Sequence, residues 1–285
     1  MKDIIIIGAG PAGLSAALYT CRAGLSTTLI FRDGGALAKA SEIGNYFGSG
    51  VISGGEMLAT GRKQAADLGA ELLEEEVLSV SWDGNFTVST ASGEYRAKAV
   101  LLATGSGFKS ARIPGLKELE GRGVSYCAVC DGFLYRGKKV GVLGSGEYAL
   151  HELNELLPLA GEVVLLSNGK PVTAAFPENI KIADEPIKEI AGEDVVEHVR
   201  FTDGTAISLS GIFVALGSAG ATDLARKLGV PVEGDKIVTN PDGSTMLPGL
   251  FAAGDCVSAV KQVSVAVGQG ALAGLAAIEY VRKMK

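Results

Sequence analysis

Residues 4–13 read IIIIGAGPAG, a run of four isoleucines followed by a glycine-rich turn. Four β-branched residues in succession are typical of a strand buried on both faces, and helical spacing follows from Leu14 to Arg22. A G-x-G-x-x-G motif between a strand and a helix is the arrangement that binds dinucleotides. The first glycine makes the tight turn, the second lets a pyrophosphate approach the backbone, and the third lets helix and strand pack. Free N–H groups at the helix start then bind the anion, so this stretch predicts a dinucleotide-binding unit.

The next residues continue this unit. A second strand is predicted at Thr27–Phe31, and Asp33 lies near the position where an acid holds a ribose hydroxyl. An aspartate before two glycines is equally typical of a surface turn, so both interpretations of Asp33 stay open. We expect a helix over Met57–Leu68, and then strands at Leu78–Val80, Phe86–Thr90, Tyr95–Ala97 and Ala99–Leu102, the last ending in Ala103-Thr104-Gly105.

The same pattern starts again after Pro114-Gly115. A strand is predicted at Lys139–Leu143, a turn at Gly144–Ala149 and a helix at Leu150–Leu157. Strands are also predicted at Val163–Leu166 and at Ile212–Ala215, where Leu216-Gly217 repeats the earlier ending. This internal repeat is a stronger signal than either glycine motif alone. It predicts an α/β fold of two Rossmann-like, three-layer ββα dinucleotide-binding domains, the second (residues 114–217) inserted in the first (residues 1–113 and 218–285).

The second copy is shorter, and the place of the loss bears on its ligand. NADP needs Arg or Lys just after the second strand, whereas NAD needs Asp or Glu there. This chain has Ser167-Asn168-Gly169-Lys170-Pro171 at that position. The next strand is predicted at Asn179–Ile182, which leaves only Pro171–Pro177 for the helix expected between. We therefore predict that the second domain does not bind a nicotinamide dinucleotide in the usual way.

A cysteine pair stands in front of the second copy, in Cys127-Ala128-Val129-Cys130-Asp131. Two intervening residues let the sulfurs close a small disulfide ring that a reductant can reopen. Asp131 would serve as a proton donor or acceptor, since the thiolate is the reactive form. Half of a zinc site is the alternative, but it needs a second ligand pair. The remaining cysteines and histidines are scattered singly, so no metal is predicted, and Cys21 and Cys256 are expected to be buried apolar residues.

The C-terminal part is predicted to complete the first domain. A strand over Leu250–Ala253 ends in Gly254-Asp255, which places a carboxylate where the ribityl or phosphate part of a flavin could be held. Gln262-Val263 then leads into a helix whose first N–H groups could face a flavin ring. The apolar run Val263–Ile278 is short for a membrane span and is typical of a buried helix start with small residues.

The composition limits the classes of function. The chain has 285 residues, 47% of them hydrophobic, and a formal net charge of −6, which argues against a nucleic-acid partner. Ile4–Cys21 is apolar and near the N-terminus, as a signal peptide would be, but glycines and a proline interrupt it. Four cysteines, two of them in Cys-x-x-Cys, fit a reducing compartment. We expect a cytoplasmic protein without a membrane partner.

Together these pieces resemble the low-molecular-weight thioredoxin reductase family, across essentially the whole chain. The segments that match are Gly8–Gly13, Gly34-Gly35, Glu42–Asn45, Ala103–Gly105, Cys127–Phe133, Gly254-Asp255 and Lys261–Val263. The glutathione-reductase-like branch is disfavoured, because it carries its cysteines in the first domain and a catalytic histidine near the C-terminus, and no histidine follows His198.

The resemblance implies one FAD per chain, a homodimer, thioredoxin as the partner, and a central domain that swings between flavin and thioredoxin. It implies that Cys130 faces the flavin, Cys127 attacks the partner disulfide and Asp131 is the acid or base. The FAD-binding residues that it implies, together with those named above, are Gly8, Gly10, Pro11, Ala12, Gly13, Asp33, Gly35, Leu37, Asn45, Val77, Thr104, Gly105, Gly254, Asp255, Lys261, Gln262 and Val263.

The chain departs from this family at the nucleotide contacts. The His-Arg-Arg-x-x-x-Arg block is missing where Ser167–Lys170 stands, His151 replaces the first of two glutamates, and Lys261 replaces an arginine. A degenerate second domain with an intact dithiol resembles the ferredoxin-dependent flavin thioredoxin reductases, so reduced ferredoxin is the expected electron donor. Two alternatives stay open: an NADPH-dependent thioredoxin reductase with altered contacts, and a flavin-binding sensor, scaffold or two-flavin disulfide oxidoreductase.

Overall fold

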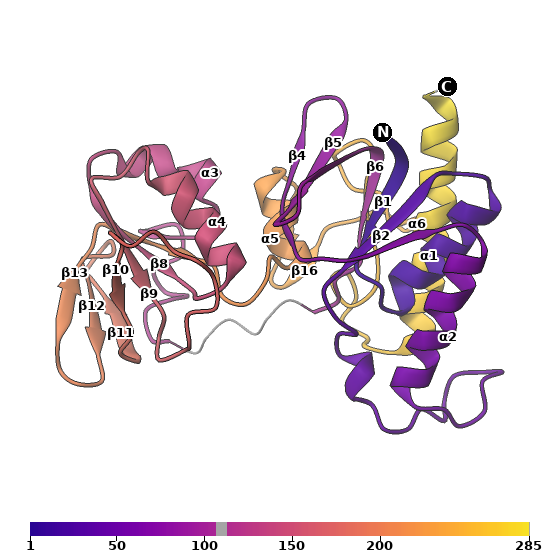
Figure 1. Cartoon of the computed structure of the whole chain (residues 1–285), viewed down its shortest axis with the longest axis horizontal. Helices are drawn as coiled ribbons and strands as arrows, with labels where there is room; N and C mark the ends of the chain where they lie inside the picture. The colour runs from indigo at the N-terminus through magenta and orange to yellow at the C-terminus, as the bar shows by residue number, and fades with distance from the viewer. Residues whose placement is uncertain (107–112, 285) are drawn as a thin grey trace. The chain divides into compact units, whose positions relative to one another are not determined.

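The computed structural model describes residues 1–106 and 113–284. The chain forms two compact units, one made of Met1–Gly107 and Gly220–Lys285 and the other of Phe108–Ala219. We call them the first and the second unit. The predicted fold class is confirmed, since each unit is built on a largely parallel sheet with helices and the second interrupts the first in sequence (Figure 1). The predicted domain borders, after residues 113 and 217, stay a prediction.

A seven-stranded sheet forms the centre of the first unit, in the order β3-β2-β1-β6-β5-β4 with β17 also paired to β6. Five strands are mutually parallel, whereas β4 and β5 are antiparallel to their neighbours. The bounds are β1 Lys2–Ile7, β2 Thr27–Phe31, β3 Glu71–Glu74, β4 Val77–Trp82, β5 Phe86–Thr90, β6 Glu94–Leu102 and β17 Leu250–Ala252. A two-stranded ribbon, β15 Val232–Glu233 with β16 Lys236–Ile237, completes the strands described for this unit.

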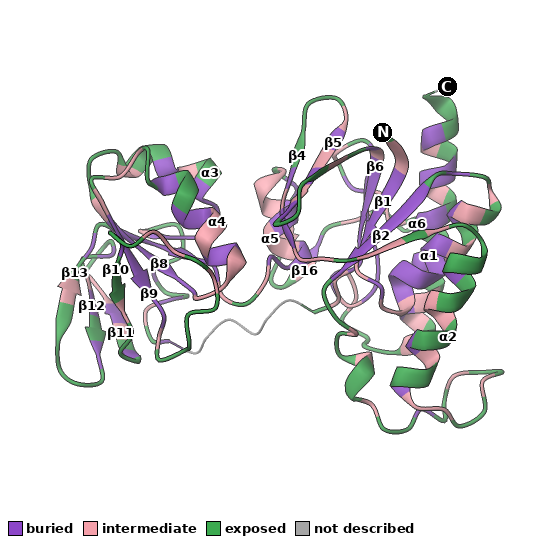
Figure 2. Ribbon diagram, in the orientation of Figure 1, coloured by how far each residue is buried: buried purple, intermediate pink, exposed green. Residues whose placement is uncertain are grey.

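The parallel strands end at a common edge. Ile7 is in register with Ile30 and with Leu102, and Leu102 is in register with Ala252. The isoleucines of β1 are fully or almost fully buried, as the run of four predicts (Figure 2). The glycine turn after β1 therefore lies beside the segments that follow β6 and β17.

β6 corrects one prediction. The two strands predicted at Tyr95–Ala97 and Ala99–Leu102 are a single strand, which pairs with β5 along its first half and with β1 and β17 along its second. Lys98 interrupts the apolar pattern without ending the strand, because its Nζ lies 2.7 Å from the Asp3 carboxylate. Burial raises the pKa of Asp3, but hydrogen bonds from Lys98 and Ser26 outweigh it, so the pKa lies below its usual value.

Helices α1 (Pro11–Arg22) and α6 (Val263–Lys283) pack against each other in the first unit (Figure 1). Small residues make this possible: a Cβ on Gly270 would lie 2.1 Å from the Ala12 carbonyl oxygen. The apolar run Val263–Ile278 was expected to be short for a membrane span, but the helix continues to Lys283. With 21 residues, α6 is long and apolar enough to cross a membrane, by length and composition only. Its buried side, which packs against α1, accounts for part of that apolar composition.

The first unit has two further α-helices and one 3-10 helix among its described residues. α2 spans Gly54–Asp67 rather than beginning at Met57, because Ser53 and Glu56 form a reciprocal capping box. The 3-10 helix η1 spans Leu37–Lys39, and α5 spans Ala221–Lys227.

The second unit repeats the plan. Its five-stranded sheet has the order β10-β9-β8-β14-β7, parallel throughout, so β8 and β14 stand where β1 and β6 stand in the first unit. The chain between β10 and β14 forms a separate, three-stranded antiparallel sheet. The strands are β7 Val124–Ser125, β8 Lys139–Leu143, β9 Glu162–Leu166, β10 Lys181–Ala183, β11 Ile187–Ala191, β12 His198–Phe201, β13 Ala206–Ser208 and β14 Gly211–Val214.

The helices of the second unit are few. α3 (Ala128–Asp131) and the 3-10 helix η2 (Gly132–Tyr135) precede β8, and α4 spans Glu147–Leu156. Residues 167–180, all described, contain no helix between β9 and β10, so the helix that was expected to be shortened to Pro171–Pro177 is missing altogether.

Candidate active site

In the first glycine turn, Gly8 and Gly13 are tightly packed against the protein backbone, whereas Gly10 faces free space. A Cβ on Gly8 would lie 2.3 Å from the Ala103 carbonyl oxygen, and one on Gly13 would lie 1.9 Å from the Gly8 carbonyl oxygen. These two glycines therefore let turn, strand and helix touch. By contrast, a Cβ on Gly10 would meet nothing within 4 Å. Space in front of the second glycine is what a pyrophosphate requires.

The start of α1 suits an anion. Gly10 is its N-cap and makes no side-chain capping bond, Pro11 stands in the first turn, and that turn contains no acidic residue. The first N–H groups of a helix have no partner within the helix and carry its positive end. This geometry fits the phosphates of a dinucleotide.

The second glycine turn has the same backbone contact but different surroundings. A Cβ on Gly144 would lie 2.2 Å from the Ala215 carbonyl oxygen, as at Gly8 in the first unit. A Cβ on Gly146, however, would lie 3.4 Å from the hydroxyl of Thr173. The Thr173 N–H donates to the Ser145 carbonyl at 2.8 Å, and Glu147 begins α4. A threonine and a carboxylate thus stand where the first unit offers open space and no acid.

The segment after β9 is fixed by its own hydrogen bonds. The Asn168 side-chain oxygen accepts from the Ile187 N–H at 2.7 Å, and the Gly169 N–H donates to the Asp184 carbonyl at 2.7 Å. Ser167 is fully buried. Asn168 and Gly169 thus link β9 to the following strands, which gives the Asn168 side chain a structural role rather than one toward a 2′-phosphate.

Several predicted FAD-binding residues lie at the edge where the parallel strands of the first unit end. Gly254 has a φ of +86°, and its N–H donates to Gln269 at 3.0 Å. The Thr104 hydroxyl accepts from the Ala221 N–H at 2.8 Å, and Gly105 follows with a φ of +75°. Asp255 continues the chain after Gly254.

A second set of predicted FAD-binding residues lies at the start of α6. The Asn45 side chain donates to Gln262 at 3.1 Å, although 217 positions separate them. Gln262 is the N-cap of α6 and Val263 its first residue. Lys261, just before them, is exposed.

Asp33 forms a turn. Its carboxylate accepts from the Gly35 N–H at 2.7 Å and pairs with Arg32 at 2.9 Å. The Gly35 N–H and the charge of Arg32 lower the pKa of Asp33 below its usual value, although burial opposes them. Of the other predicted contacts, Leu37 is half-buried in η1 and Val77 is buried at the start of β4.

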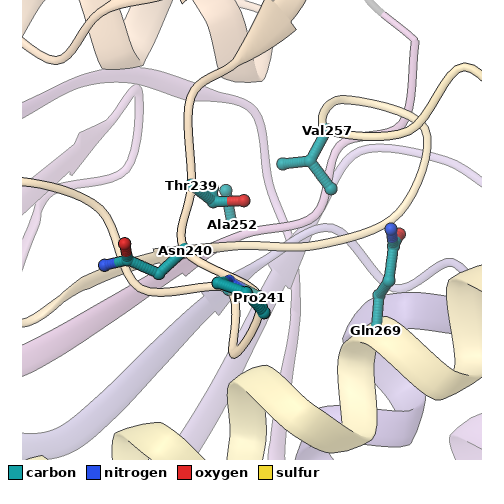
Figure 3. Close-up of a pocket in the computed structure, with 7 residues that line it drawn as sticks. Thr239, Asn240, Pro241, Ala252, Val257 and Gln269 are labelled. Carbon is teal, nitrogen blue, oxygen red and sulfur yellow. The ribbon is translucent and has the colours of Figure 1, made fainter.

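Gln269, which accepts the hydrogen bond from Gly254, also lines a small cavity (Figure 3). Its volume is about 250 Å³, below the usual range for a cofactor pocket of roughly 300–1,000 Å³. It is lined by Thr239, Asn240, Pro241, Gly243, Ala252, Val257 and Gln269. None of the predicted FAD contacts lines it.

The cysteine pair of the second unit is a disulfide. Cys127 and Cys130 are bonded, with their Cα atoms 5.3 Å apart. Cys127 is buried and Cys130 is exposed. Cys21 and Cys256 are both free thiols. Cys256 is buried as predicted, and burial raises the pKa of its thiol to about 12. Cys21 is only half-buried, so its predicted burial was wrong.

Hydrogen bonds hold the disulfide turn from two sides. The Ser125 hydroxyl donates to Asp131 at 2.6 Å and accepts from the Cys127 N–H at 3.1 Å. The Glu152 carboxylate, from α4, accepts from the Ala128 N–H at 2.8 Å. The apolar side chains of Val129, Phe133 and Leu134, which are close to the turn in sequence, are exposed.

Sequence reasoning missed Ser125, Glu152 and Thr173 as parts of these sites. Ser125 lies two residues before Cys127, so a local polar contact was foreseeable. Glu152 and Thr173 act on residues 24 and 28 positions away, which no local pattern indicates. Among residues 1–106 and 113–284, no three His, Cys, Asp or Glu side chains are grouped to hold a metal ion, and the absence of a metal stays a prediction.

Comparison with known proteins identifies the class. The family profile of the pyridine nucleotide-disulphide oxidoreductases matches residues 2–270. The chain belongs to this family.

Its relatives narrow the class. The chain is 36% identical to the thioredoxin reductase of Listeria innocua, covering 99% of this chain and 95% of that protein. Among solved structures, the atypical thioredoxin reductase TRi from Desulfovibrio vulgaris Hildenborough matches with a TM-score of 0.94 and 39% identity over 99% of both chains. A ferredoxin-flavin thioredoxin reductase from Clostridium acetobutylicum matches with a TM-score of 0.76 and 30% identity, over 99% of this chain and 98% of the other.

The protein is therefore a thioredoxin-reductase-like flavoprotein with a redox disulfide at Cys127 and Cys130, and its cofactor is FAD. The resemblance inferred from the sequence is confirmed. FAD fits the first unit, because the open face of Gly10 and the acid-free start of α1 leave room for its phosphates. At the second turn, by contrast, a Cβ on Gly146 would be in van der Waals contact with the Thr173 hydroxyl.

Proposed function

We propose that the protein reduces the disulfide of a thioredoxin with electrons that come from reduced ferredoxin rather than from NADPH. One contact carries this proposal: Thr173 lies against the Gly146 turn, with its N–H 2.8 Å from the Ser145 carbonyl. An NADPH pyrophosphate would need that space, and Glu147 adds an acidic residue to the first turn of α4, although this residue alone does not decide the donor. The similarity to a ferredoxin-flavin thioredoxin reductase supports the same donor.

FAD, when bound, can take up electrons one at a time and deliver them in pairs, which suits a one-electron donor. Gly10, Pro11, Ala12 and the first N–H groups of α1 would hold its phosphates. Asp255 and Thr104 would contact its central part, and Asn45, Gln262 and Val263 its ring. The remaining residues predicted from the sequence are proposed in the same supporting role: Gly8, Gly13, Asp33, Gly35, Leu37, Val77, Gly105, Gly254 and Lys261.

The cysteines carry out the exchange with the partner. Two electrons and two protons convert the Cys127–Cys130 disulfide into two thiols. The Cys127 thiolate then attacks the partner disulfide, and a mixed disulfide forms as one partner sulfur leaves. Attack by Cys130 on that mixed disulfide closes the original ring and releases the partner as a dithiol.

The exchange also needs a proton donor and acceptor next to the cysteines. Asp131, held by the Ser125 hydroxyl, would give and take the proton. Because Cys127 is buried in the disulfide form, its sulfur must become accessible after the ring opens.

We further propose a homodimer in the cytoplasm, an FAD-binding domain over 1–113 and 218–285, and a dithiol domain over 114–217.

The donor is tested with the oxidised holoenzyme in the absence of air. Reduced ferredoxin and NADPH are added separately, and flavin absorbance is followed by stopped flow. Ferredoxin is expected to bleach the flavin rapidly, while NADPH leaves it oxidised over the same period. Rapid bleaching of the flavin by NADPH would refute the proposal that ferredoxin, and not NADPH, is the electron donor.

The NADPH alternative has one observation in its favour, since the second unit keeps the parallel strand order and the glycine turn of a dinucleotide fold. The bleaching experiment separates the two donors directly. The sensor or scaffold alternative is tested with Cys130→Ser, in which the ring cannot form. Thioredoxin turnover equal to that of the unaltered protein would show that the dithiol is not the route.

A further inference from the structure

Glu152 is unusual in its burial. Only 1% of the residue is exposed, and it is the one buried Asp or Glu in the described part of the chain. Its helical neighbours Leu153 and Leu156 are fully buried too, so α4 directs this residue into the interior of the second unit. A glutamate in such surroundings needs a polar partner, because removing a carboxyl group from water is costly.

The partner lies in the disulfide turn. The Glu152 carboxylate accepts a hydrogen bond from the Ala128 N–H at 2.8 Å. Ala128 directly follows Cys127, is fully buried and is the first residue of α3. α3 has four residues, and a single helical turn is not stable alone. The bond to Glu152 is thus a tertiary contact that can hold both sulfurs in place.

We propose that Glu152 is a positioning residue of the redox centre, holding the Ala128 N–H when the ring is closed and after it opens. The proposal deepens the proposed function and rests on its assignment of Cys127–Cys130 as the redox pair. In the disulfide form the covalent bond already fixes the turn. In the dithiol form only hydrogen bonds remain, so Glu152 would keep the two thiols close enough to close again.

The consequence is a change in the dithiol–disulfide equilibrium. Without an acceptor at position 152, the closed ring keeps a buried Ala128 N–H unsatisfied, whereas the open form can loosen and hydrate it. The disulfide therefore loses stability relative to the dithiol. Loss of one buried hydrogen bond in one of two states corresponds to about a tenfold change in equilibrium constant, or about 30 mV for a two-electron couple.

The test uses the FAD-loaded protein and glutathione, without ferredoxin, NADPH or thioredoxin. Two glutathione thiols reduce the Cys127–Cys130 disulfide to two thiols and become glutathione disulfide. The fraction reduced is measured by thiol labelling and mass spectrometry of the peptide that contains both cysteines. Because no donor or partner enters, failure of this inference is distinct from failure of the proposed function.

Three variants give the contrast. Glu152→Leu keeps the volume but has no acceptor, Glu152→Gln keeps an acceptor oxygen, and Glu155→Leu alters an exposed glutamate of the same helix. We expect the equilibrium constant for reduction to rise about tenfold in Glu152→Leu, and to stay within about threefold in the other two. An unchanged constant in Glu152→Leu, or an equal rise in Glu152→Gln, would overturn the proposal.

A measurement without any variant covers the case in which Glu152→Leu does not fold. Amide hydrogen exchange of Ala128 is followed in the oxidised and in the reduced unaltered protein. The proposal expects slow exchange in both, because the bond to Glu152 persists. Exchange at Ala128 as fast as in the exposed loops, once the disulfide is reduced, would overturn it.

Discussion

Replacing Gly10 by alanine separates the binding of FAD from the stability of the fold. The new methyl group would meet no protein atom within 4 Å, and the backbone at Gly10 has a φ of −83°, which alanine adopts without strain. Such a substitution typically stabilises a protein by about 0.4–1 kcal/mol, through a less flexible unfolded chain. The stability of the flavin-free protein should therefore be equal to or slightly above that of the unaltered protein.

Flavin binding should respond in the opposite direction. The methyl group would occupy the space through which a pyrophosphate approaches the turn. A hydrogen bond between a backbone N–H and a charged group contributes about 1.5–3 kcal/mol, so loss of one weakens FAD binding by roughly 10- to 100-fold. Titration of the flavin-free protein with FAD, followed by flavin fluorescence, measures this, and urea unfolding of the same protein measures stability.

Two further glycines provide controls. Gly55→Ala adds a methyl group within α2 where nothing lies within 4 Å, and it should leave FAD binding unchanged. Gly13→Ala would place a Cβ 1.9 Å from the Gly8 carbonyl oxygen, so it should lower stability by about 1–3 kcal/mol even without FAD. Wild-type FAD affinity in Gly10→Ala, or a loss of stability like that of Gly13→Ala, would refute the reasoning.

Three other predictions concern packing and titration. Gly270→Ala should lower the free energy of unfolding by about 1–3 kcal/mol, measured in urea, because the Cβ would lie 2.1 Å from the Ala12 carbonyl oxygen; equal stability would contradict the α1–α6 packing. Asp3→Asn should lower stability at neutral pH, because the folded protein holds the pKa of Asp3 below its ordinary value of 3.8. This advantage is present above that pH and is lost as the pH falls through the folded-state pKa, so melting curves of the two proteins should converge in acid; a constant difference would contradict the role of Lys98. Cys256, whose thiol pKa is raised to about 12 by burial, should resist iodoacetamide at pH 8 until the protein is unfolded, and mass spectrometry of the native protein would reveal any labelling.

The sequence predicts most of what depends on neighbours along the chain. The isoleucines of β1, the turn at Gly8 and the disulfide ring each depend on residues within about ten positions, and each is found where predicted. Helix α2 begins three residues before its predicted start at Met57, since its capping box precedes the apolar spacing that we used to locate it.

What the sequence did not predict depends on contacts between distant segments. β6 continues through Lys98 because the amine reaches Asp3, 95 positions away. Thr173 reaches the turn at Ser145, and Glu152 reaches Ala128, from other elements of the second unit. Such pairs have no periodicity to reveal them, and only the folded chain brings them together.

The two copies of the dinucleotide fold show why a glycine motif alone does not define a ligand. An added Cβ on Gly8 or Gly144 would collide with the carbonyl oxygen of the residue that directly follows the neighbouring parallel strand, so this close approach is shared by both turns. Gly10 and Gly146 differ, because one faces open space and the other faces Thr173. The second glycine is therefore the position at which the two turns differ. The first unit keeps the open turn that suits the phosphates of FAD, and the second unit contributes the disulfide.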